Sequence, residues 1–445
     1  MTPVLALAQA FWLARRNFVR LRGAALVDYQ DRRAQSIVAF ARRHSPFYSV
    51  HHSDQPAHDW RLLPTLDKAV MMENFSSLNT RHISIDTAMA TALAAEMSGD
   101  FSPHVEGLTV GLSSGTSGNR GLFLVDEEEE ARWIGTVLAR VAPRIGLRGL
   151  HITLFSMSGS NLYRRLGQGW LRFEHFNLAT SIDEAVVHLN ASPPDVLVAP
   201  PSYLQALSER KCAGELRANP KRLISVAEVL EPHVEARLRE HFACEVQQIY
   251  LCTEGLIGIS CKAGRLHLQE DLVAVQAEPV DAESDSVRIT PVITDLWRRV
   301  QPIIRYRLND ILVLAAPHEC TCGSSFRVIE RIEGRVDDIC RFLTPEGFER
   351  MVFPATLRQM VLVSSPDILD YEAIQERDSH LRVRVDLAPN VDFLGVSRLV
   401  RQAIEAGLHE QGVGAIHLEI EQGKPKRFIT NKLRRVRRVL PGALE

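Results

Sequence analysis

The chain has 445 residues, of which 45% are hydrophobic and 24% charged, and its formal net charge is -2. The length exceeds what one hydrophobic core usually supports, and the balanced charge gives no general reason to expect a nucleic-acid partner. The seven cysteines, an odd number scattered along a long chain, argue against a disulfide framework and for a reducing compartment. We therefore expect two or more domains and a cytoplasmic location.

The first hundred residues are predicted to be mainly helical. The run PVLALAQAFWLARRNFVRL is interrupted by Gln9 and stopped by Arg15 and Arg16, well short of the roughly 20 apolar residues that cross a bilayer. It also lacks the charged start and small-residue cleavage site of a signal peptide. We expect an amphipathic helix packed on the body, no transmembrane segment, and at most a weak membrane-surface contact. Farther on, KAVMMENF and DTAMATALAAEM carry apolar residues at helical spacing.

From Thr109 onward short apolar runs alternate with helical segments. LHITLF, PDVLVAP, LISVAEVL and CEVQQIYL look like buried strands, and EARLREHF like a helix between two of them, which favours an α/β layer structure. RLHLQEDLVAVQAEP and DSVRITPVITDL predict antiparallel strands of a smaller sheet. The last hundred residues have a β-α-β order that fits a small α+β lid. The polar stretch GRVDDI at 334–339 is the predicted junction between a core of layered α/β subdomains (1–336) and the lid (337–445).

The stretch SSGTSGNR at 113–120 has a composition that no packed core requires. Two glycines and four hydroxyl residues in eight positions can present backbone N–H groups and hydroxyls around a phosphate. It follows an apolar, β-prone run, so it lies where a loop leaves a strand. A Ser/Gly-rich surface turn is the alternative, and the absence of a Lys-Ser or Lys-Thr pair excludes a Walker loop.

Four further features follow in a fixed order. IYLCTEG (249–255) places Thr253 and Glu254 just past a strand, at the sheet edge where ligands usually bind. PIIRYRLND (302–310), ERIEGRVDD (330–338) and KPKRFITNKLRR (424–435) follow it. Taken singly, each has an ordinary structural explanation as a helix start, a turn or a solvated basic face. Chance would have to produce all five features, the glycine-rich stretch included, in one fixed order, so we read them together as one site.

This order resembles the ANL superfamily of adenylate-forming acyl and aryl ligases. It is most similar to the branch that contains phenylacetate–coenzyme A ligase and coenzyme F synthetase-like proteins, and within it to a group of adenylate-forming enzymes that share SSGTSG-RGLF, APPS and SVAEVLEP. The resemblance runs from about Tyr29 to the C-terminus and is strongest between Gly111 and Asp338. It implies activation of a carboxylic acid by ATP as an acyl-adenylate, with release of pyrophosphate and transfer of the acyl group to a thiol.

The resemblance also implies a role for each matching residue. The catalytic residues would be Thr253 on the α-phosphate, Glu254 on Mg²⁺, and Lys432, which would reach the α-phosphate and the substrate carboxylate. Asp310, assisted by Arg335, would bind the ribose hydroxyls, and Asp337 would be the hinge of the lid. The β- and γ-phosphates would be held by the glycine-rich loop, that is by Ser113, Ser114, Gly115, Thr116, Ser117 and Gly118. The adenine would be held by Tyr250, Ala227 and Glu228.

The sequence departs from the family pattern in three places. Asn431 stands where glycine is frequent before the lysine, which leaves Lys426 as a rival for the catalytic role. Arg120 ends the glycine loop where lysine-proline is common, and is either a phosphate contact or a surface cation. After GRVDD the chain reads ICRFLTPEGFERMVFP in place of a glycine-containing strand turn. The last departure bears on the thiol-transfer step more than on adenylation.

A possible metal site lies in the region of the smaller sheet. Cys261 and His267 stand upstream of Cys320 and Cys322, and three thiols with an imidazole suit a closed tetrahedral structural zinc. The CxC spacing is less diagnostic than CxxC, and free cysteines as small core residues are the alternative. Cys252, beside the TEG motif, is expected to line the pocket because ATP already supplies the electrophile.

The acid pocket is predicted in LFSMSGSNLYRRLGQGWLRFEHF and APPSYL. Aromatic walls from Tyr163 and Phe176, with Pro201 and Ser202, favour an aryl or other planar acid, although half of the aromatic residues are expected to pack the core. The resemblance implies coenzyme A or an acyl carrier protein as acceptor, and the basic run 424–438 suits either. An amine acceptor, a reaction that stops at the adenylate and a non-catalytic nucleotide-binding protein remain alternatives.

Overall fold

The computed structural model describes residues 3–98, 104–113, 120–141, 149–156, 171–280, 288–316, 320–425 and 434–439. The chain forms two compact units, which we describe separately. The first comprises Met1–Glu278, Pro291–Leu308 and Leu314–Glu330, and the second Pro279–Thr290, Asn309–Val313 and Arg331–Glu445. No helix among the described residues is long and apolar enough to span a bilayer.

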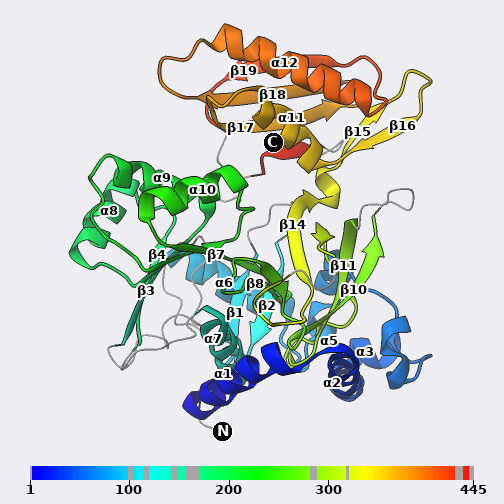
Figure 1. Ribbon diagram of the computed structural model, residues 1–445. Helices are drawn as coiled ribbons and strands as arrows, with labels where there is room; N and C mark the ends of the chain where they lie inside the picture. The colour runs from blue at the N-terminus through cyan, green and yellow to red at the C-terminus, as the bar shows by residue number, and fades with distance from the viewer. Residues whose placement is uncertain are drawn as a thin grey trace. The chain divides into compact units, whose positions relative to one another are not determined.

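The N-terminal part of the first unit is helical, as predicted (Figure 1). Its elements are α1 (Pro3–Arg20), α2 (Gly23–His44), α3 (Pro46–His51), the 3₁₀ helix η1 (Ala57–Leu62), α4 (Lys68–Glu73), α5 (Phe75–Leu78) and α6 (Ile85–Ser98). The helix predicted across KAVMMENF is interrupted at Asn74, whose side-chain amide donates to the Val70 carbonyl at 2.9 Å and closes α4. Polar capping by asparagine thus divides one apolar run into two short helices.

The glycine-rich stretch lies between two antiparallel strands, β1 (Thr109–Leu112) and β2 (Leu122–Val125). The following helix α7 (Glu127–Val141) begins with four glutamates, which favour a helix N-terminus. Helix α1 lies against α7 at Gly135. A Cβ there would lie 2.6 Å from the Leu7 carbonyl oxygen and 2.9 Å from the Ala10 Cβ, so glycine is required for this close approach.

Five parallel strands form the centre of the first unit. Their order is β4-β3-β5-β6-β7, and β8 and β9 continue the sheet beyond β7 in antiparallel pairing. The strands are β3 (Leu150–Ser156), β4 (Leu171–Asn177), β5 (Val196–Ala199), β6 (Arg222–Val226), β7 (Glu245–Cys252), β8 (Gly255–Ser260) and β9 (Leu266–Leu268). The runs RLHLQEDLVAVQAEP and DSVRITPVITDL, expected in a separate smaller sheet, instead supply strands of the large one.

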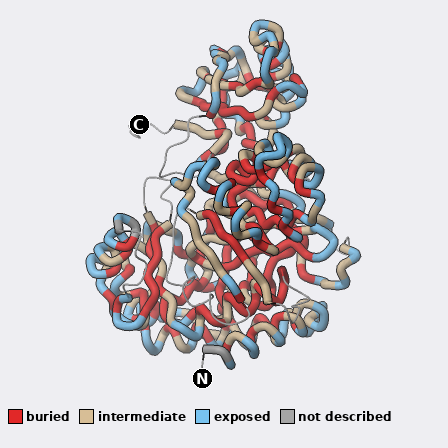
Figure 2. The backbone as a smooth tube through the Cα atoms, turned by 90° about the vertical axis from the view of Figure 1, so that its left-hand side faces the viewer, coloured by how far each residue is buried: buried red, intermediate tan, exposed pale blue. Residues whose placement is uncertain are grey.

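Helices cover both faces of this sheet, which confirms the predicted α/β class. One face packs on α8 (Ile182–Ala191), α9 (Pro201–Cys212) and α10 (Pro232–Phe242), and the other on α7 and α1. The central strands β5 and β6 are largely buried, the edge strand β4 is less so, and the outward helix faces are exposed (Figure 2). Such continuous burial explains why the strands read as apolar runs without alternation.

Farther along the chain lie β10 (Val273–Pro279), β11 (Arg288–Asp295), β12 (Tyr306–Arg307), β13 (Asp310–Leu314) and β14 (Val328–Arg335). In the first unit Ile293 of β11 pairs with Tyr306 of β12, and Val328 of β14 pairs with His267 of β9. In the second unit Ile289 of β11 pairs with Leu312 of β13. Leu66 adds a parallel bridge to Tyr306, which brings the start of α4 to β12.

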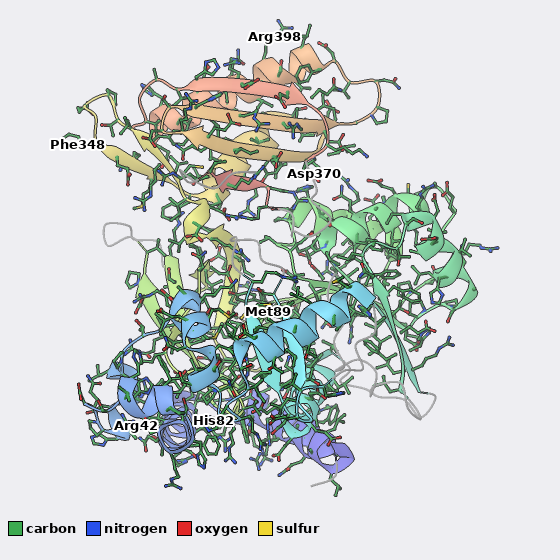
Figure 3. All side chains as sticks on the ribbon, turned by 180° about the vertical axis from the view of Figure 1, so that it is seen from behind. Arg42, His82, Met89, Phe348, Asp370 and Arg398 are labelled. Atoms are coloured by element: carbon green, nitrogen blue, oxygen red, sulfur yellow. The ribbon has the colours of Figure 1, made fainter. Side chains whose placement is uncertain are left out.

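The second unit contains a four-stranded sheet in the order β19-β18-β17-β20. Helix α12 buries Val396, Val400, Ile404 and Leu408, an i, i+4 stripe, in the core beside this sheet. Phe348, in the turn between β15 and β16, is largely exposed (Figure 3). The elements are η3 (Val336–Asp338), β15 (Cys340–Leu343), β16 (Glu349–Val352), α11 (Pro354–Ser364), β17 (Ile368–Arg377), β18 (His380–Leu387), α12 (Phe393–Glu410), β19 (His417–Gln422) and β20 (Val436–Arg438).

Candidate active site

Several predicted site residues lie at the carboxyl edge of the parallel strands. Pro201 and Ser202 follow β5, Ala227 and Glu228 follow β6, and Thr253 and Glu254 follow β7. The chain order reverses between β3 and β5, where neighbouring connections leave in opposite directions. Ligands of open α/β sheets bind at such a switch point. The topology thus gathers three of the predicted segments at the edge where a ligand site is expected.

The turn after β6 has a strained backbone. Ala227 adopts a φ of 69°, and the Glu228 N–H donates to the Val226 carbonyl at 2.8 Å, which closes a tight γ-turn around it. The Glu228 carboxylate then accepts hydrogen bonds from the Ser202 backbone N–H at 3.2 Å and from its hydroxyl at 3.1 Å. An acid at the start of α9 is favourable because the helix presents unpaired N–H groups there. One side chain therefore joins the predicted adenine-edge and acid-pocket segments.

Glu254 is a buried carboxylate with one hydrogen-bond donor directed at it. Its side chain is 7% exposed, and the Tyr306 hydroxyl donates to Oε1 at 2.8 Å. Burial and the adjacent Glu254 carboxylate both raise the pKa of Tyr306. Tyr306 therefore keeps its proton and acts as a fixed donor. Among the described residues no hydrogen bond reaches Oε2 of Glu254, which leaves that oxygen for another partner.

Arg298 connects the TEG turn to the glycine-loop hairpin. Its Nη1 donates to the Thr253 carbonyl at 2.8 Å, and its Nη2 donates to the Leu124 carbonyl on β2 at 3.4 Å. Gln301 reinforces the link, because its Oε1 accepts from Arg298 at 3.2 Å and from the Leu124 N–H at 2.9 Å. The base of the glycine loop and the Thr253–Glu254 pair are thereby held by one buried network.

A lysine that the sequence analysis did not identify lies at the base of the glycine loop. The Lys68 Nζ donates to the Ser113 hydroxyl at 3.4 Å, and that hydroxyl also accepts the Gly121 N–H at 2.6 Å. Leu66 exchanges backbone hydrogen bonds with Arg305 and Arg307, at 3.1 and 2.8 Å, which fixes the start of α4 beside Tyr306. No local motif marks Lys68, because this placement depends on pairing with a strand far along the chain.

The other predicted residues of the first unit have varied surroundings. Tyr250 lies on β7 opposite Gly258. Phe176 stacks on Phe155 with ring centroids 5.3 Å apart and contacts the His188 ring at 4.3 Å, so core packing engages its ring. Its role in an acid pocket stays a prediction. The remaining predicted residues lie outside the described residues: Ser114, Gly115, Thr116, Ser117, Gly118, Tyr163, Lys432 and its rival Lys426.

In the second unit the predicted ribose and hinge residues lie on neighbouring segments. Asp310 begins β13 and forms an ion pair with Arg335 at 3.6 Å. Asp337 accepts a hydrogen bond from the Asn309 side chain, and the Val336 N–H donates to the Asn309 carbonyl at 2.8 Å. The next residue, Asp338, is buried and pairs with Arg434. These bonds fix the conformation of the predicted hinge segment.

The four predicted zinc ligands converge in the first unit. The ligand atoms of Cys261, His267, Cys320 and Cys322 all lie within 4.8 Å of one another. Two of these residues come from the β8–β9 region and two from the loop before β14, so the sheet pairing of β9 with β14 brings them together.

Comparison with solved structures identifies the fold. No family model and no curated protein matches the sequence. The structure resembles 2-hydroxyisobutyryl-CoA ligase in its postadenylation state with an acyl-AMP bound, with a TM-score of 0.70, 19% identity, and coverage of 95% of this chain and 91% of that chain. It also resembles the anthranilate CoA ligase AuaEII with anthranoyl-AMP (TM-score 0.50, 14% identity, 73% and 65% covered). A structure from a study of fatty acyl-adenylate ligases from E. coli and L. pneumophila also matches. Its TM-score is 0.50 and its sequence identity 13%, and the match covers 73% of this chain and 68% of that chain.

The chain therefore has the fold of the ANL superfamily of adenylate-forming enzymes, as the sequence motifs predicted. The match to 2-hydroxyisobutyryl-CoA ligase covers nearly the whole length of both chains.

Proposed function

We propose that the protein is an ATP-dependent acid–thiol ligase. It activates a carboxylic acid as an acyl-adenylate, releases pyrophosphate, and then transfers the acyl group to coenzyme A or to the thiol of an acyl carrier protein. The observation that supports this most strongly is the Arg298 network, which holds the Thr253–Glu254 turn beside the glycine-loop hairpin. A non-catalytic surface turn would not need this buried connection.

The chemistry requires positive charge and N–H donors at the phosphates. A carboxylate attacks the α-phosphorus of ATP, so two anions must meet, and negative charge builds on the phosphoryl oxygens. The described residues supply a cation at Lys68, and the Ser113 segment leads into a loop rich in backbone N–H groups. Lys432 would act on the α-phosphate in this proposal, as the sequence resemblance implies.

The donor set also fits Mg²⁺. Glu254 presents a hard carboxylate oxygen, the ligand type that Mg²⁺ prefers, and Tyr306 fixes the other oxygen of the same group. Bound Mg²⁺ would offset the charge of the triphosphate. Thr253 would bond the α-phosphate, and Asp310 with Arg335 would bind the ribose. Glu228 would hold the adenine-edge turn in place through Ser202, and Asp337 would be the hinge.

An aryl or other planar acid is the proposed substrate class. The switch point between β3 and β5 is followed by Pro201 and Ser202, and the aromatic residues Phe155 and Tyr203 stack beneath this edge with centroids 4.8 Å apart. The resemblance to an anthranilate CoA ligase concerns the fold. The aryl acid named for that enzyme supports an aryl acid as the substrate class and no particular acid.

One assay tests the proposal. A panel of aryl and aliphatic acids is incubated with ATP, Mg²⁺ and either coenzyme A or a phosphopantetheine carrier protein, and pyrophosphate, AMP and acylated thiol are measured. Acid-dependent pyrophosphate with an acylated thiol supports the ligase. Pyrophosphate without thiol acylation overturns the thiol-transfer half, and a repeat with amines then distinguishes an amide synthetase. No pyrophosphate with any acid overturns adenylation itself.

A further inference from the structure

Four potential metal ligands lie outside the proposed nucleotide site and take no part in its chemistry. We propose that Cys261, His267, Cys320 and Cys322 bind one structural zinc ion, and that this ion fixes the turn on which the junction of α1 and α2 docks. The inference is independent of the proposed ligase activity.

Two of the ligand–ligand distances are close to those of tetrahedral zinc, and all the ligand atoms lie within 4.8 Å of one another. With Zn–S of about 2.3 Å and Zn–N of about 2.0–2.1 Å, tetrahedral geometry separates two sulfurs by roughly 3.8 Å and a sulfur and a nitrogen by roughly 3.6 Å. The Cys261 and Cys320 sulfurs are 3.6 Å apart, and the Cys322 sulfur is 3.5 Å from the His267 Nε2. A disulfide requires about 2.05 Å, so these sulfurs are not bonded to each other.

The histidine is held in the tautomer that binds a metal. His267 is completely buried, and its Nδ1 lies 2.8 Å from the Phe326 carbonyl oxygen. A carbonyl only accepts, so Nδ1 carries the proton and Nε2 presents its lone pair toward Cys322. A carbonyl behind a histidine ligand is the usual way in which proteins orient it toward zinc.

Two of the cysteine sulfurs accept hydrogen bonds from backbone N–H groups, as metal-bound sulfurs commonly do. The Ala263 N–H donates to the Cys261 sulfur at 3.3 Å, and the Ser324 N–H donates to the Cys322 sulfur at 3.4 Å. Both donors come from the second residue after the cysteine, and both turns contain a glycine with positive φ, Gly264 at 78° and Gly323 at 90°. Backbone donors of this kind stabilise negative sulfur. Small core thiols would not require two such turns.

The set of ligands selects zinc and excludes catalysis by the ion. Three thiolates and an imidazole suit Zn²⁺, whereas Mg²⁺ and Ca²⁺ prefer oxygen ligands. Four protein ligands fill a tetrahedral site and leave no position for water or substrate. The ion is therefore structural.

The same turn carries contacts from the N-terminal helices. Arg22 Nη2 donates to the Gly323 carbonyl at 2.6 Å, and the Ser325 hydroxyl donates to the Leu21 carbonyl at 2.9 Å. Phe18 of α1 makes edge contacts with the rings of His267 and Phe326, with centroids 5.5 and 5.4 Å apart. Loss of the ion frees the loop of Cys320 and Cys322, and with it the docking surface of residues 18–22.

The test measures metal content, thiol protection and protease sensitivity on the full-length protein. Protein purified without a chelator or a histidine tag is expected to contain one equivalent of zinc, and replacement by Co²⁺ is expected to give the absorption of tetrahedral cobalt thiolate. After chelation three further thiols of the seven become reactive, and trypsin cleaves faster at Arg20 and Arg22. Adding zinc back reverses both changes.

Variants separate binding from folding. Cys320→Ser with Cys322→Ser is expected to lose the zinc, whereas Cys212→Ser, the same change at an exposed thiol outside the cluster, retains it. If the double variant does not fold, the chelation experiment on the unaltered protein still decides. Less than a tenth of an equivalent of zinc together with no cobalt spectrum overturns the site. Stoichiometric zinc with an unchanged tryptic pattern after its removal overturns the docking role.

Discussion

The Tyr306 hydroxyl donates a hydrogen bond of 2.8 Å to Oε1 of Glu254, across 52 positions of sequence. The carboxylate proposed to hold Mg²⁺ is therefore oriented by a buried phenol that burial and Glu254 itself keep protonated. The RYRLND motif thus contributes Tyr306 to the first unit, in addition to the proposed ribose contact of Asp310 in the second.

Tyr306→Phe is expected to raise the Mg²⁺ concentration required for half-maximal adenylation by about 10-fold or more, since a hydrogen bond to a charged group contributes about 1.5–3 kcal/mol. A Mg²⁺ titration of pyrophosphate release measures the shift. Tyr29→Phe is the control, because it removes a phenol bonded at 3.1 Å to the Asp271 carbonyl. An unchanged Mg²⁺ requirement in Tyr306→Phe would show that the phenol does not orient the metal ligand.

Arg298→Lys keeps the charge but cannot reach Thr253, Leu124 and Gln301 at once. We expect the free energy of unfolding to fall by about 1–3 kcal/mol for each buried acceptor left unpaired. We also expect adenylation to fall more than 10-fold under conditions where the variant is folded. Denaturant unfolding and pyrophosphate release are measured together, with Arg299→Lys as the neighbouring control. Full activity in a destabilised but folded Arg298→Lys would separate the network from catalysis.

Lys432→Ala is expected to reduce adenylation by about 10²–10³-fold while ATP binding stays nearly intact, because the lysine acts on charge that develops in the transition state. Lys426→Ala is its matched control. The two are compared by initial rates of pyrophosphate release and by equilibrium nucleotide binding. A large loss in Lys426→Ala with normal rates in Lys432→Ala would transfer the role to Lys426.

His52 makes the first unit sensitive to acid. It is 1% exposed, neither ring nitrogen has a hydrogen-bond partner among the described residues, and burial lowers its pKa from 6.5 to about 3. The unfolded state takes up this proton at higher pH than the folded state, so the stability contribution is complete above about pH 6.5 and decreases as the pH falls toward 3. At pH 4 the loss is about 3 kcal/mol, at 1.36 kcal/mol per unit.

Unfolding by denaturant at pH 7 and pH 4 checks this expectation. In His52→Gln the decrease between the two pH values should be smaller than in the unaltered protein by about that amount. His58→Gln changes an exposed imidazole, with a side-chain exposure of 70%, and should leave the decrease as it is. Equal acid sensitivity with and without the His52 imidazole would assign the effect to other groups.

Features set by local sequence were predictable, and those set by long-range pairing were not. The buried strands and the α12 stripe follow from apolar spacing, and the sequence order of the motifs placed Glu254 at a strand end. The assignment of RLHL to a separate sheet was wrong, because β9 pairs with both β8 and β14. No local sequence pattern reveals this pairing. Strands β17 and β20, which form a parallel pair within the second unit, were not predicted.

The site shows the same division. Thr253 and Glu254 could be identified from a motif, whereas Lys68 could not, because its position depends on Leu66 pairing beside Tyr306. Arg298 was likewise missed, since its role is to bond carbonyls of two segments that are 129 positions apart in the chain and have no shared motif. The predicted boundary at 336/337 stays a prediction.

The most direct measurement is acid-dependent exchange of labelled pyrophosphate into ATP, compared between the unaltered protein and Glu254→Gln. We predict exchange that requires both Mg²⁺ and a carboxylic acid, and that falls by about 10²-fold or more in Glu254→Gln while the protein remains folded. Nucleotide binding without exchange for any acid, or exchange that persists undiminished in Glu254→Gln, would contradict the account.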